Sequence, residues 1–357
     1  MRISRFLATV LLGSLLGATG ATGVAWPGGV EGPENVAKPG AIVAIGDSYL
    51  SGEAAGDYAP GTDTASNQCH QSTRSLIHQT GLTNVDVALN LACSGSTTAN
   101  LRLGGTDRYG GRSQIEQLGD ILAVYDVRAV VVSVGGNDLG FGEMIRDCIA
   151  AYLPLVADCG DAIAARLPAQ LDQVSASVGA VLDDVHAVLA EGGHGPDDAQ
   201  VVLVSYPSPV TERIRSPWLR LAMGCPFTLN DLAFARNELT PSIANAWAEV
   251  AASRGDRFLD LSRALEGHEV CARGASPGSE WAKGIFVNTA QIRRGIGMHL
   301  ISQSLHPNEV GHAQLGRCLG RFLAMTDARA LCLADPDHDG ALTAVATTVS
   351  APISPSG

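Results

Sequence analysis

The sequence predicts an α/β protein built on a mainly parallel, five-stranded sheet. Short apolar segments rich in Val, Ile and Leu recur along the chain, and segments with helical periodicity lie between them. Strands that alternate with helices run parallel, because each helix crosses over the sheet and covers one of its faces. The strands are expected at 41–45, 85–91, 129–134, 201–205 and 257–261.

The first and third of these segments have the clearest strand patterns. Residues 41–45 form a continuous apolar run, which is typical of a strand buried on both faces. Residues 129–134 read AVVVSV and end at Gly135-Gly136, so a β-branched run stops at two turn-forming residues. Each pattern therefore predicts a buried strand that ends in a tight turn.

Three helices are predicted, at 168–191, 229–253 and 308–325. In the first, apolar residues recur at steps of three and four, so they share one face that can be buried. These residues are Leu171, Val174, Val178, Val181, Leu182, Val185 and Leu189. Gly192-Gly193 follows and is expected to end this helix.

Composition and charge restrict the class of protein. Hydrophobic residues make up 46% of the 357 residues, which suits a folded chain with a sizeable core. The net charge of −12 argues against non-specific binding to nucleic acid, which needs a basic surface. Beyond the N-terminus no apolar run reaches the roughly 18 residues of a spanning helix. We therefore expect no integral membrane segment in the mature chain.

The N-terminus has the pattern of a secretory signal peptide. Arg2 and Arg5 precede an apolar segment at 6–16, and small residues follow as far as Ala25. Cleavage is expected after Ala21 or Ala25. A buried helix or an uncleaved anchor is the alternative, but the basic-then-apolar order favours secretion. The expected divisions are a signal at 1–25, a flexible lead at 26–40, an ordered domain at 41–333 and a disordered tail at 334–357.

The chain has eight cysteines, an even number that predicts disulfides in an oxidising compartment. Their spacings lack the paired C-x₂-C sets of a zinc site, and we expect no metal and no cofactor. Proximity in the sequence suggests the pairs Cys69–Cys93, Cys148–Cys159, Cys225–Cys271 and Cys318–Cys332.

Polar residues with catalytic potential follow three of the predicted strands and precede the last predicted helix. Ser48 lies in Gly46-Asp47-Ser48, where a tight strand-to-helix turn can expose its hydroxyl oxygen. A nearby His306 could accept the serine proton. The Gly95 N–H and the Asn137 amide could hold a developing oxyanion. Ligands collect at the carboxyl ends of parallel strands, so these residues are expected to meet.

This combination resembles the SGNH hydrolases, also called GDSL esterases and lipases. Ser48, Gly95, Asn137 and His306 stand at the four positions that name the family. The resemblance runs from about residue 41 to about residue 332 and is closest to the secreted bacterial members with several disulfides. The stretch GDSYLSGEAAGDY, the later Cys69-His70 pair and GHEVC at 267–271 are similar to theirs. The resemblance implies a flavodoxin-like, three-layer α/β/α fold and hydrolysis of acyl esters without a cofactor.

The same resemblance implies a role for each residue. Ser48 is expected to be the nucleophile and, with Gly95 and Asn137, to form the oxyanion hole, while His306 acts as general base and then acid. The family usually has Asp three residues before the histidine, and here that position is Gln303. We therefore expect a Ser–His dyad in which the Gln303 main-chain carbonyl orients His306. Asp260, at a strand end, is the alternative acid.

Several other polar residues are given structural roles. Asp47 is expected to brace the turn, and the histidines expected to be structural are His70, His268, His299 and His312. Residues 335–340 begin like a calcium loop, but the twelfth position is Ala346 and not the bidentate Glu of an EF-hand. Residues 213–223 could form an acyl-binding rim or a lid, or simply pack as an insertion.

The leading hypothesis is a secreted, monomeric serine esterase or lipase that acts on a small-molecule or lipid ester. A carbohydrate esterase that removes acetyl groups from polysaccharide would use the same four residues. A non-catalytic surface protein on this fold is the third possibility, and the intact set of named residues argues against it.

Overall fold

One sheet of seven strands organises the computed structural model of the chain. The strand order is β2-β1-β3-β4-β5-β6-β7. All neighbours pair in parallel except β7, which runs antiparallel to β6. The structure describes residues 37–155, 157–285, 303–335, 337 and 340–347. The strands are β1 (Gly40–Gly46), β2 (Val87–Asn90), β3 (Asp126–Ser133), β4 (Gln200–Val204), β5 (Arg257–Asp260), β6 (Arg329–Ala334) and β7 (Leu342–Ala346).

The predicted α/β class is confirmed, but the expected number of strands is wrong. The first five strands overlap the five predicted segments, and β6 and β7 extend the sheet at one edge. Strand β7 also corrects the expectation that the whole of 334–357 is disordered. Leu342 is buried, and β7 pairs with β6 from Leu342↔Ala334 to Ala346↔Ala330. The Ala- and Thr-rich composition of this segment gave no strand signal, but its backbone groups form hydrogen bonds with those of β6.

Helices of very different lengths connect the strands. The principal ones are α3 (Gln114–Val124), α4 (Phe141–Leu155), α5 (Gly160–Glu191), α6 (Leu229–Phe234), α7 (Thr240–Ala252) and α10 (Glu309–Ala324). Single turns form α1 (Ser48–Ser51), α2 (Thr98–Leu101), η1 (Leu76–Gln79) and η2 (Pro217–Leu219), and a π-helical segment, η3 (Ala235–Leu239), joins α6 to α7. The helix predicted at 168–191 lies within α5, the one at 229–253 corresponds to α6, η3 and α7 together, and the one at 308–325 corresponds to α10. Neither α3 nor α4 was predicted.

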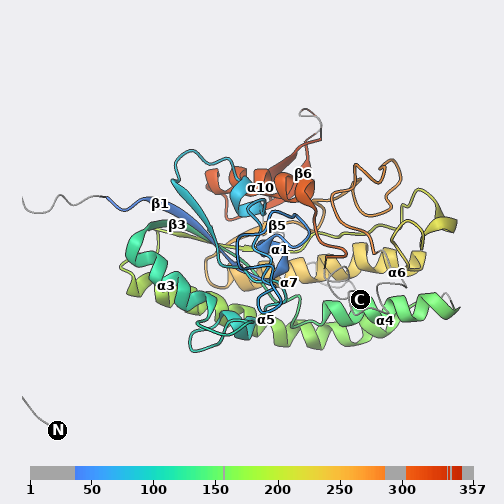
Figure 1. Cartoon of the computed structure of the whole chain (residues 1–357), viewed down its shortest axis with the longest axis horizontal. Coiled ribbons are helices and arrows are strands. Elements are labelled where there is room, and N and C mark those ends of the chain that lie inside the picture. The colour runs from blue at the N-terminus through green and yellow to red at the C-terminus, as the bar shows by residue number, and fades with distance from the viewer. Residues whose placement is uncertain (1–36, 156, 286–302, 336, 338–339, 348–357) are drawn as a thin grey trace, which may run out of the picture. The chain divides into compact units, whose positions relative to one another are not determined.

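The helices cover both faces of the sheet, as the three-layer expectation requires. Helices α3, α5 and α7 pack together on one face, and α10 packs with η1 and the β6–β7 edge on the other (Figure 1). The core between these layers is apolar. Val130, Val131, Trp247 and Phe322 are fully buried within it.

Four disulfides join the eight cysteines in the pairs that proximity in the sequence suggested. They are Cys69–Cys93, Cys148–Cys159, Cys225–Cys271 and Cys318–Cys332. The expected signal peptide, and the lead as far as residue 36, lie outside the described residues. The described residues from Lys38 onward belong to one compact unit. Within the described part, no helix has both the length and the apolar character needed to cross a bilayer.

Candidate active site

Ser48 stands where β1 turns sharply into α1. Gly46 has φ +152°, and a Cβ there would lie 2.1 Å from the Ser133 carbonyl oxygen of the neighbouring strand, so only glycine fits. Asp47 then caps α1, since its Oδ1 accepts a 3.1 Å hydrogen bond from the Tyr49 N–H. This turn leaves the Ser48 side chain at the carboxyl end of the sheet and 8% exposed.

His306 comes from a tight turn just before α10 and meets Ser48 across 258 positions of sequence. Its Nε2 atom lies 2.7 Å from Ser48 Oγ, and its Nδ1 atom lies 3.1 Å from the Ser304 carbonyl oxygen. The Tyr49 hydroxyl donates to the Leu305 carbonyl at 3.0 Å and so ties this turn to α1. The predicted Ser48–His306 pair is therefore brought together, with Ser48 at one ring nitrogen of His306 and the Ser304 carbonyl at the other.

The Ser304 contact determines which ring nitrogen of His306 carries the proton. A carbonyl oxygen can only accept, so Nδ1 must donate, and the Nε2 lone pair of the neutral ring then faces Ser48. Burial lowers the pKa of His306, while the charge of Glu53 and the bond to Ser304 act to raise it. The neutral, proton-accepting ring is thus favoured near pH 7.

The prediction that the Gln303 carbonyl orients His306 is wrong. Leu305 has φ +62°, and this left-handed residue folds the chain so that the Ser304 carbonyl reaches Nδ1. The Gln303 carbonyl faces the His306 backbone N–H at 3.4 Å instead. The Gln303 side chain is held by Lys283 Nζ at 2.7 Å and by the Tyr58 hydroxyl at 3.2 Å.

Asp260, the alternative acid, is occupied elsewhere at the end of β5. Its Oδ1 atom accepts hydrogen bonds from Ser205 Oγ at 3.2 Å and from the Ser262 N–H at 2.8 Å. Its Oδ2 atom lies 3.9 Å from Arg329. These contacts give Asp260 a structural role at the carboxyl end of β5.

Gly95 and Asn137 line the same pocket as Ser48 and His306. Gly95 has φ +80°, and the Arg108 guanidinium lies so close that a Cβ at this position would be 2.6 Å from Nε. Asn137 Nδ2 donates to the Ser96 carbonyl at 2.9 Å, which fixes the amide and leaves its second N–H for another acceptor. The four residues predicted from the sequence therefore converge on one site.

Tyr206 is a site residue that the sequence did not reveal. Its hydroxyl donates to Asp47 Oδ2 at 2.6 Å and accepts the Gly136 N–H at 2.9 Å. It thereby links the residue before Ser48 to the residue before Asn137. Burial raises the pKa of Asp47 to about 7, although the hydrogen bonds from Tyr206 and Tyr49 oppose the rise. These contacts fit the bracing role expected for Asp47.

An apolar cavity of about 120 Å³ lies next to the catalytic pocket. The side chains that line both spaces are Tyr49, Phe141, Ile145, Tyr206 and Leu305. Helices α4, α5 and α6 supply much of the deeper wall, including Met144, Ile163 and Leu232. The arrangement can accept an apolar group beside the Ser48 hydroxyl.

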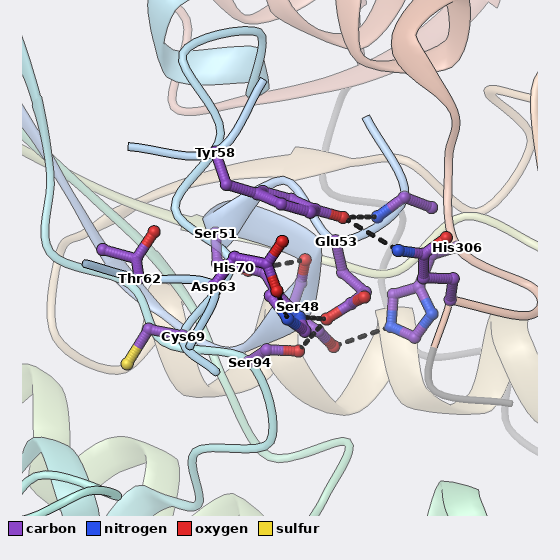
Figure 2. A network of polar contacts seen from close by, with 12 residues as sticks. Ser48, Ser51, Glu53, Tyr58, Thr62, Asp63, Cys69, His70, Ser94 and His306 are labelled. Carbon is purple, nitrogen blue, oxygen red and sulfur yellow. Dashed lines mark hydrogen bonds and ion pairs between the residues drawn. The ribbon is translucent and has the colours of Figure 1, made fainter. Parts of the chain in front are cut away.

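Most of the remaining sequence candidates have structural contacts. His268 stacks on Trp281 with ring centroids 3.8 Å apart, and His312 is buried in α10. His70 is bound to Glu53, close to Ser48 (Figure 2). His299 and part of the calcium-like loop at 335–340 lie outside the described residues. In the segment at 213–223, for which an acyl-binding rim, a lid or a packed insertion was expected, the Trp218 side chain is 94% exposed.

One group of metal-ligand types occurs among the described residues. Cys69, Cys93 and Asp107 bring potential ligand atoms together, but the two sulfurs are joined in a disulfide. Because thiolates and not disulfide sulfurs bind metals strongly, this group is not a built metal site.

Comparison with known proteins identifies relatives across most of the chain. Residues 44–314 match the model of the GDSL-like Lipase/Acylhydrolase family. A lipase of Streptomyces rimosus is 30% identical over 281 residues, which cover 76% of this chain and 87% of that protein. Lipase 1 of Streptomyces coelicolor is 24% identical over 320 residues, which cover 87% of this chain and 94% of that protein. Among solved structures, phospholipase A1 of Streptomyces albidoflavus aligns with a TM-score of 0.48 and 23% identity, over 78% of this chain and 95% of that one.

Proposed function

Since the chain belongs to the GDSL-like lipase/acylhydrolase family and is a carboxylic ester hydrolase, we propose that Ser48 and His306 carry out the reaction as a dyad. The observation that carries this proposal is the 2.7 Å contact between His306 Nε2 and Ser48 Oγ. A serine hydroxyl is a weak nucleophile until an adjacent base removes its proton. The Ser304 carbonyl supports the role of His306, because it leaves Nε2 free to accept that proton.

The reaction proceeds in two halves. Ser48 Oγ attacks the ester carbonyl carbon while His306 Nε2 takes the hydroxyl proton, and His306 then gives this proton to the leaving alcohol as the C–O bond breaks. Water attacks the resulting acyl-serine in the same manner, with His306 again first base and then acid. The products are an alcohol and a carboxylic acid, and Ser48 is regenerated.

The oxyanion of each tetrahedral intermediate is held by the N–H groups of Ser48 and Gly95 and by the Asn137 amide. Donors that are fixed before the reaction stabilise this charge without reorganisation in the transition state. The support for this assignment is that Gly95 and Asn137 line the Ser48 pocket and that the Ser96 carbonyl already orients the Asn137 amide.

The acyl group of the substrate occupies the apolar cavity beside Ser48. A cavity of about 120 Å³ that is lined mainly by apolar side chains has room for an acyl chain longer than acetyl. Burial of each methylene contributes about 0.8 kcal/mol. We therefore assign as the substrate class a lipid or other ester whose acyl chain is longer than acetyl.

This cavity also argues against the other hypotheses. An acetyl group from a polysaccharide would leave most of the apolar space unfilled, so the carbohydrate esterase alternative is not favoured. A non-catalytic binding protein would have no use for a buried serine hydroxyl directed at a neutral imidazole.

Secretion and a monomeric state complete the proposal. The basic-then-apolar N-terminus and the four disulfides support export to an oxidising compartment. The proposed catalytic groups all come from one chain, so a monomer would be sufficient for the reaction. Thiol titration of the denatured, unreduced protein should find no free thiol, and two or more titrating cysteines would contradict the four disulfides.

The function is tested with p-nitrophenyl esters from acetyl to palmitoyl and with an acetylated glycan. We expect kcat/KM to be higher for longer acyl chains than for acetyl, because each further methylene can be buried in the apolar cavity. Ser48→Ala should abolish hydrolysis, whereas Ser51→Ala, three residues along the same turn, should retain it. Preference for the acetylated glycan would overturn the substrate assignment.

A further inference from the structure

Glu53 is a fully buried carboxylate one turn after Ser48. Its backbone N–H donates to the Ser48 carbonyl at 3.2 Å, so its position is tied to that of the nucleophile. Its side chain is 0% exposed. Burial of a charged carboxylate costs several kcal/mol unless partners compensate for it. A buried carboxylate so close to Ser48 must therefore have partners that compensate for the loss of its hydration.

Two partners hold one oxygen of Glu53, and the other oxygen is left without one. His70 Nδ1 lies 2.6 Å from Oε2, and the Ser94 hydroxyl donates to the same atom. Oε1 is buried and has no hydrogen-bond partner among the described residues. Figure 2 shows the Glu53 side chain between those of His70 and His306. The carboxylate is thus anchored on the side away from the catalytic base.

The anchor is built from segments that also shape the oxyanion hole. His70 follows Cys69, Ser94 follows Cys93, and a disulfide joins the two cysteines. The Ser94 N–H also donates to the Cys69 carbonyl at 3.0 Å. Because Ser94 immediately precedes Gly95, the orientation of Glu53 is coupled to the loop that supplies an oxyanion donor.

Glu53 is ionised at neutral pH. Burial acts to raise its pKa, but the hydrogen bond from His70, the charge of His306 and the hydrogen bond from Ser94 outweigh this and lower it. The pKa of His70 is raised, since Glu53 and Asp63 outweigh the effect of burial. Asp63 lies 3.3 Å from His70 Nε2. Two carboxylates thus flank the His70 ring, and the negative charge of Glu53 lies beside the catalytic centre.

Among the described residues no carboxylate contacts the ring of His306, yet His306 becomes an imidazolium during each half-reaction. Several groups surround the His306 ring. Ser48, Tyr49 and the N-cap Asp47 come from α1 and its cap, and Ser304 comes from the turn of His306 itself. Lys283, which is bound to Gln303, lies beside that turn, and the other two groups are His312 from α10 and Glu53. Burial, and then the proximity of His306, lowers the pKa of His312 to about 3, so His312 is neutral. Of the carboxylates in the described part of the chain, Glu53 is the one whose charge raises the pKa of His306.

We propose that Glu53 is a positioning residue that stabilises the His306 imidazolium through space, in place of the contacting acid of a catalytic triad. His70 and Ser94 fix its carboxylate in the orientation that this role requires. Glu53 touches neither substrate nor the reacting atoms, and the inference rests on the proposed Ser48–His306 dyad. Its charge acts on the base in the ground state and more strongly once His306 has taken the serine proton.

The pH profile of Glu53→Gln tests this proposal. The amide keeps the shape and removes the charge, so the pKa of His306 should fall. The acid limb of kcat/KM should then move about one pH unit lower, with kcat reduced about tenfold. Glu249→Gln removes the charge of an exposed carboxylate on α7 instead, and its midpoint should match that of the unaltered enzyme. An unshifted midpoint in Glu53→Gln would overturn the proposal, whatever its effect on kcat.

A second measurement needs only the unaltered enzyme. Carboxyl ¹³C NMR should find Glu53 ionised throughout the pH range in which activity rises, and a protonated Glu53 there would overturn the proposal even if Glu53→Gln failed to fold. Activity in Ser48→Ala would instead show that the proposed function is wrong. An inactive Ser48→Ala with an unshifted Glu53→Gln would show that only the positioning role is wrong.

Discussion

The Nδ1 atom of His306 lies 3.1 Å from the carbonyl oxygen of Ser304, two residues earlier in the chain. A main-chain carbonyl fixes the imidazole tautomer as an aspartate would, but it carries no full charge to stabilise the imidazolium. The chain therefore separates two tasks that one triad acid performs elsewhere. Orientation comes from the backbone, and charge comes from a carboxylate that does not touch the ring.

Substitution of Gln303 should have little effect on the reaction. Gln303→Ala removes the contacts with Lys283 and Tyr58 but leaves the Ser304 carbonyl in place, so we expect kcat to fall less than about threefold. His306→Ala should reduce kcat at least about a thousandfold. Steady-state kinetics of both variants, with circular dichroism to verify folding, make the comparison. Equal losses in two folded variants would show that the Gln303 side chain takes part.

The acid limb of kcat/KM should have its midpoint below pH 6.5. Activity requires neutral His306, and burial lowers the pKa of His306 below the usual value of 6.5. A lowered pKa keeps the base unprotonated to lower pH, so activity should persist on mild acidification. Measurement of kcat/KM between pH 4.5 and 8 locates the midpoint. A midpoint well above 6.5 would mean that the negative charge nearby outweighs burial.

Tyr206→Phe should disturb both stability and catalysis. The variant loses the donor to Asp47 and leaves the Gly136 N–H without its buried acceptor. The free energy of unfolding should fall by about 1–3 kcal/mol. Because Gly136 precedes Asn137, kcat should fall more than KM rises. Urea unfolding and kinetics measure these effects, with Tyr125→Phe at the end of α3 as the control. A Tyr206→Phe variant indistinguishable from the control would contradict this account.

Filling the apolar cavity should shift the acyl-chain preference. Ile163 is buried in α5 and lines the cavity but not the catalytic pocket, so Ile163→Phe shortens the space without touching Ser48. We expect the ratio of dodecanoyl to butanoyl kcat/KM to fall at least about tenfold, as the loss of two methylene sites would produce. Ile121→Phe on α3 is the matched control. An unchanged ratio in Ile163→Phe would show that the acyl chain lies elsewhere.

The sequence revealed the parts of this molecule whose signals are local. The buried strand that ends in Gly46-Asp47-Ser48 indicated both the turn after β1 and the proposed nucleophile. Gly135-Gly136-Asn137 likewise indicated the turn after β3 and a proposed oxyanion donor. Strand β7 was not predicted because its sequence is rich in Ala and Thr and has no clear strand pattern. It is a strand because it pairs with β6. Helices α3 and α4 were also missed, although the Ser113–Glu116 capping box gave a signal for the start of α3.

The details of the site were harder to predict because they depend on tertiary contacts. The choice between Gln303 and Ser304 as orienting carbonyl follows from the left-handed Leu305, a conformation that the sequence does not indicate for leucine. Tyr206 follows an ordinary buried strand, and its role appears only when β4 lies beside β3. His70 was correctly expected to be structural, but its partner Glu53 becomes visible only in three dimensions.

The most direct test of the central claim is to find where an active-site phosphonate binds. A p-nitrophenyl alkylphosphonate should inactivate the enzyme and modify one residue, Ser48, as mass spectrometry of the proteolysed protein would show. Its neighbour Ser51 serves as the internal control and should remain unmodified. The His306→Ala variant should react at least about a hundredfold more slowly, because the base that activates Ser48 is gone. Modification of a residue other than Ser48, or an unchanged rate in His306→Ala, would contradict the Ser48–His306 dyad.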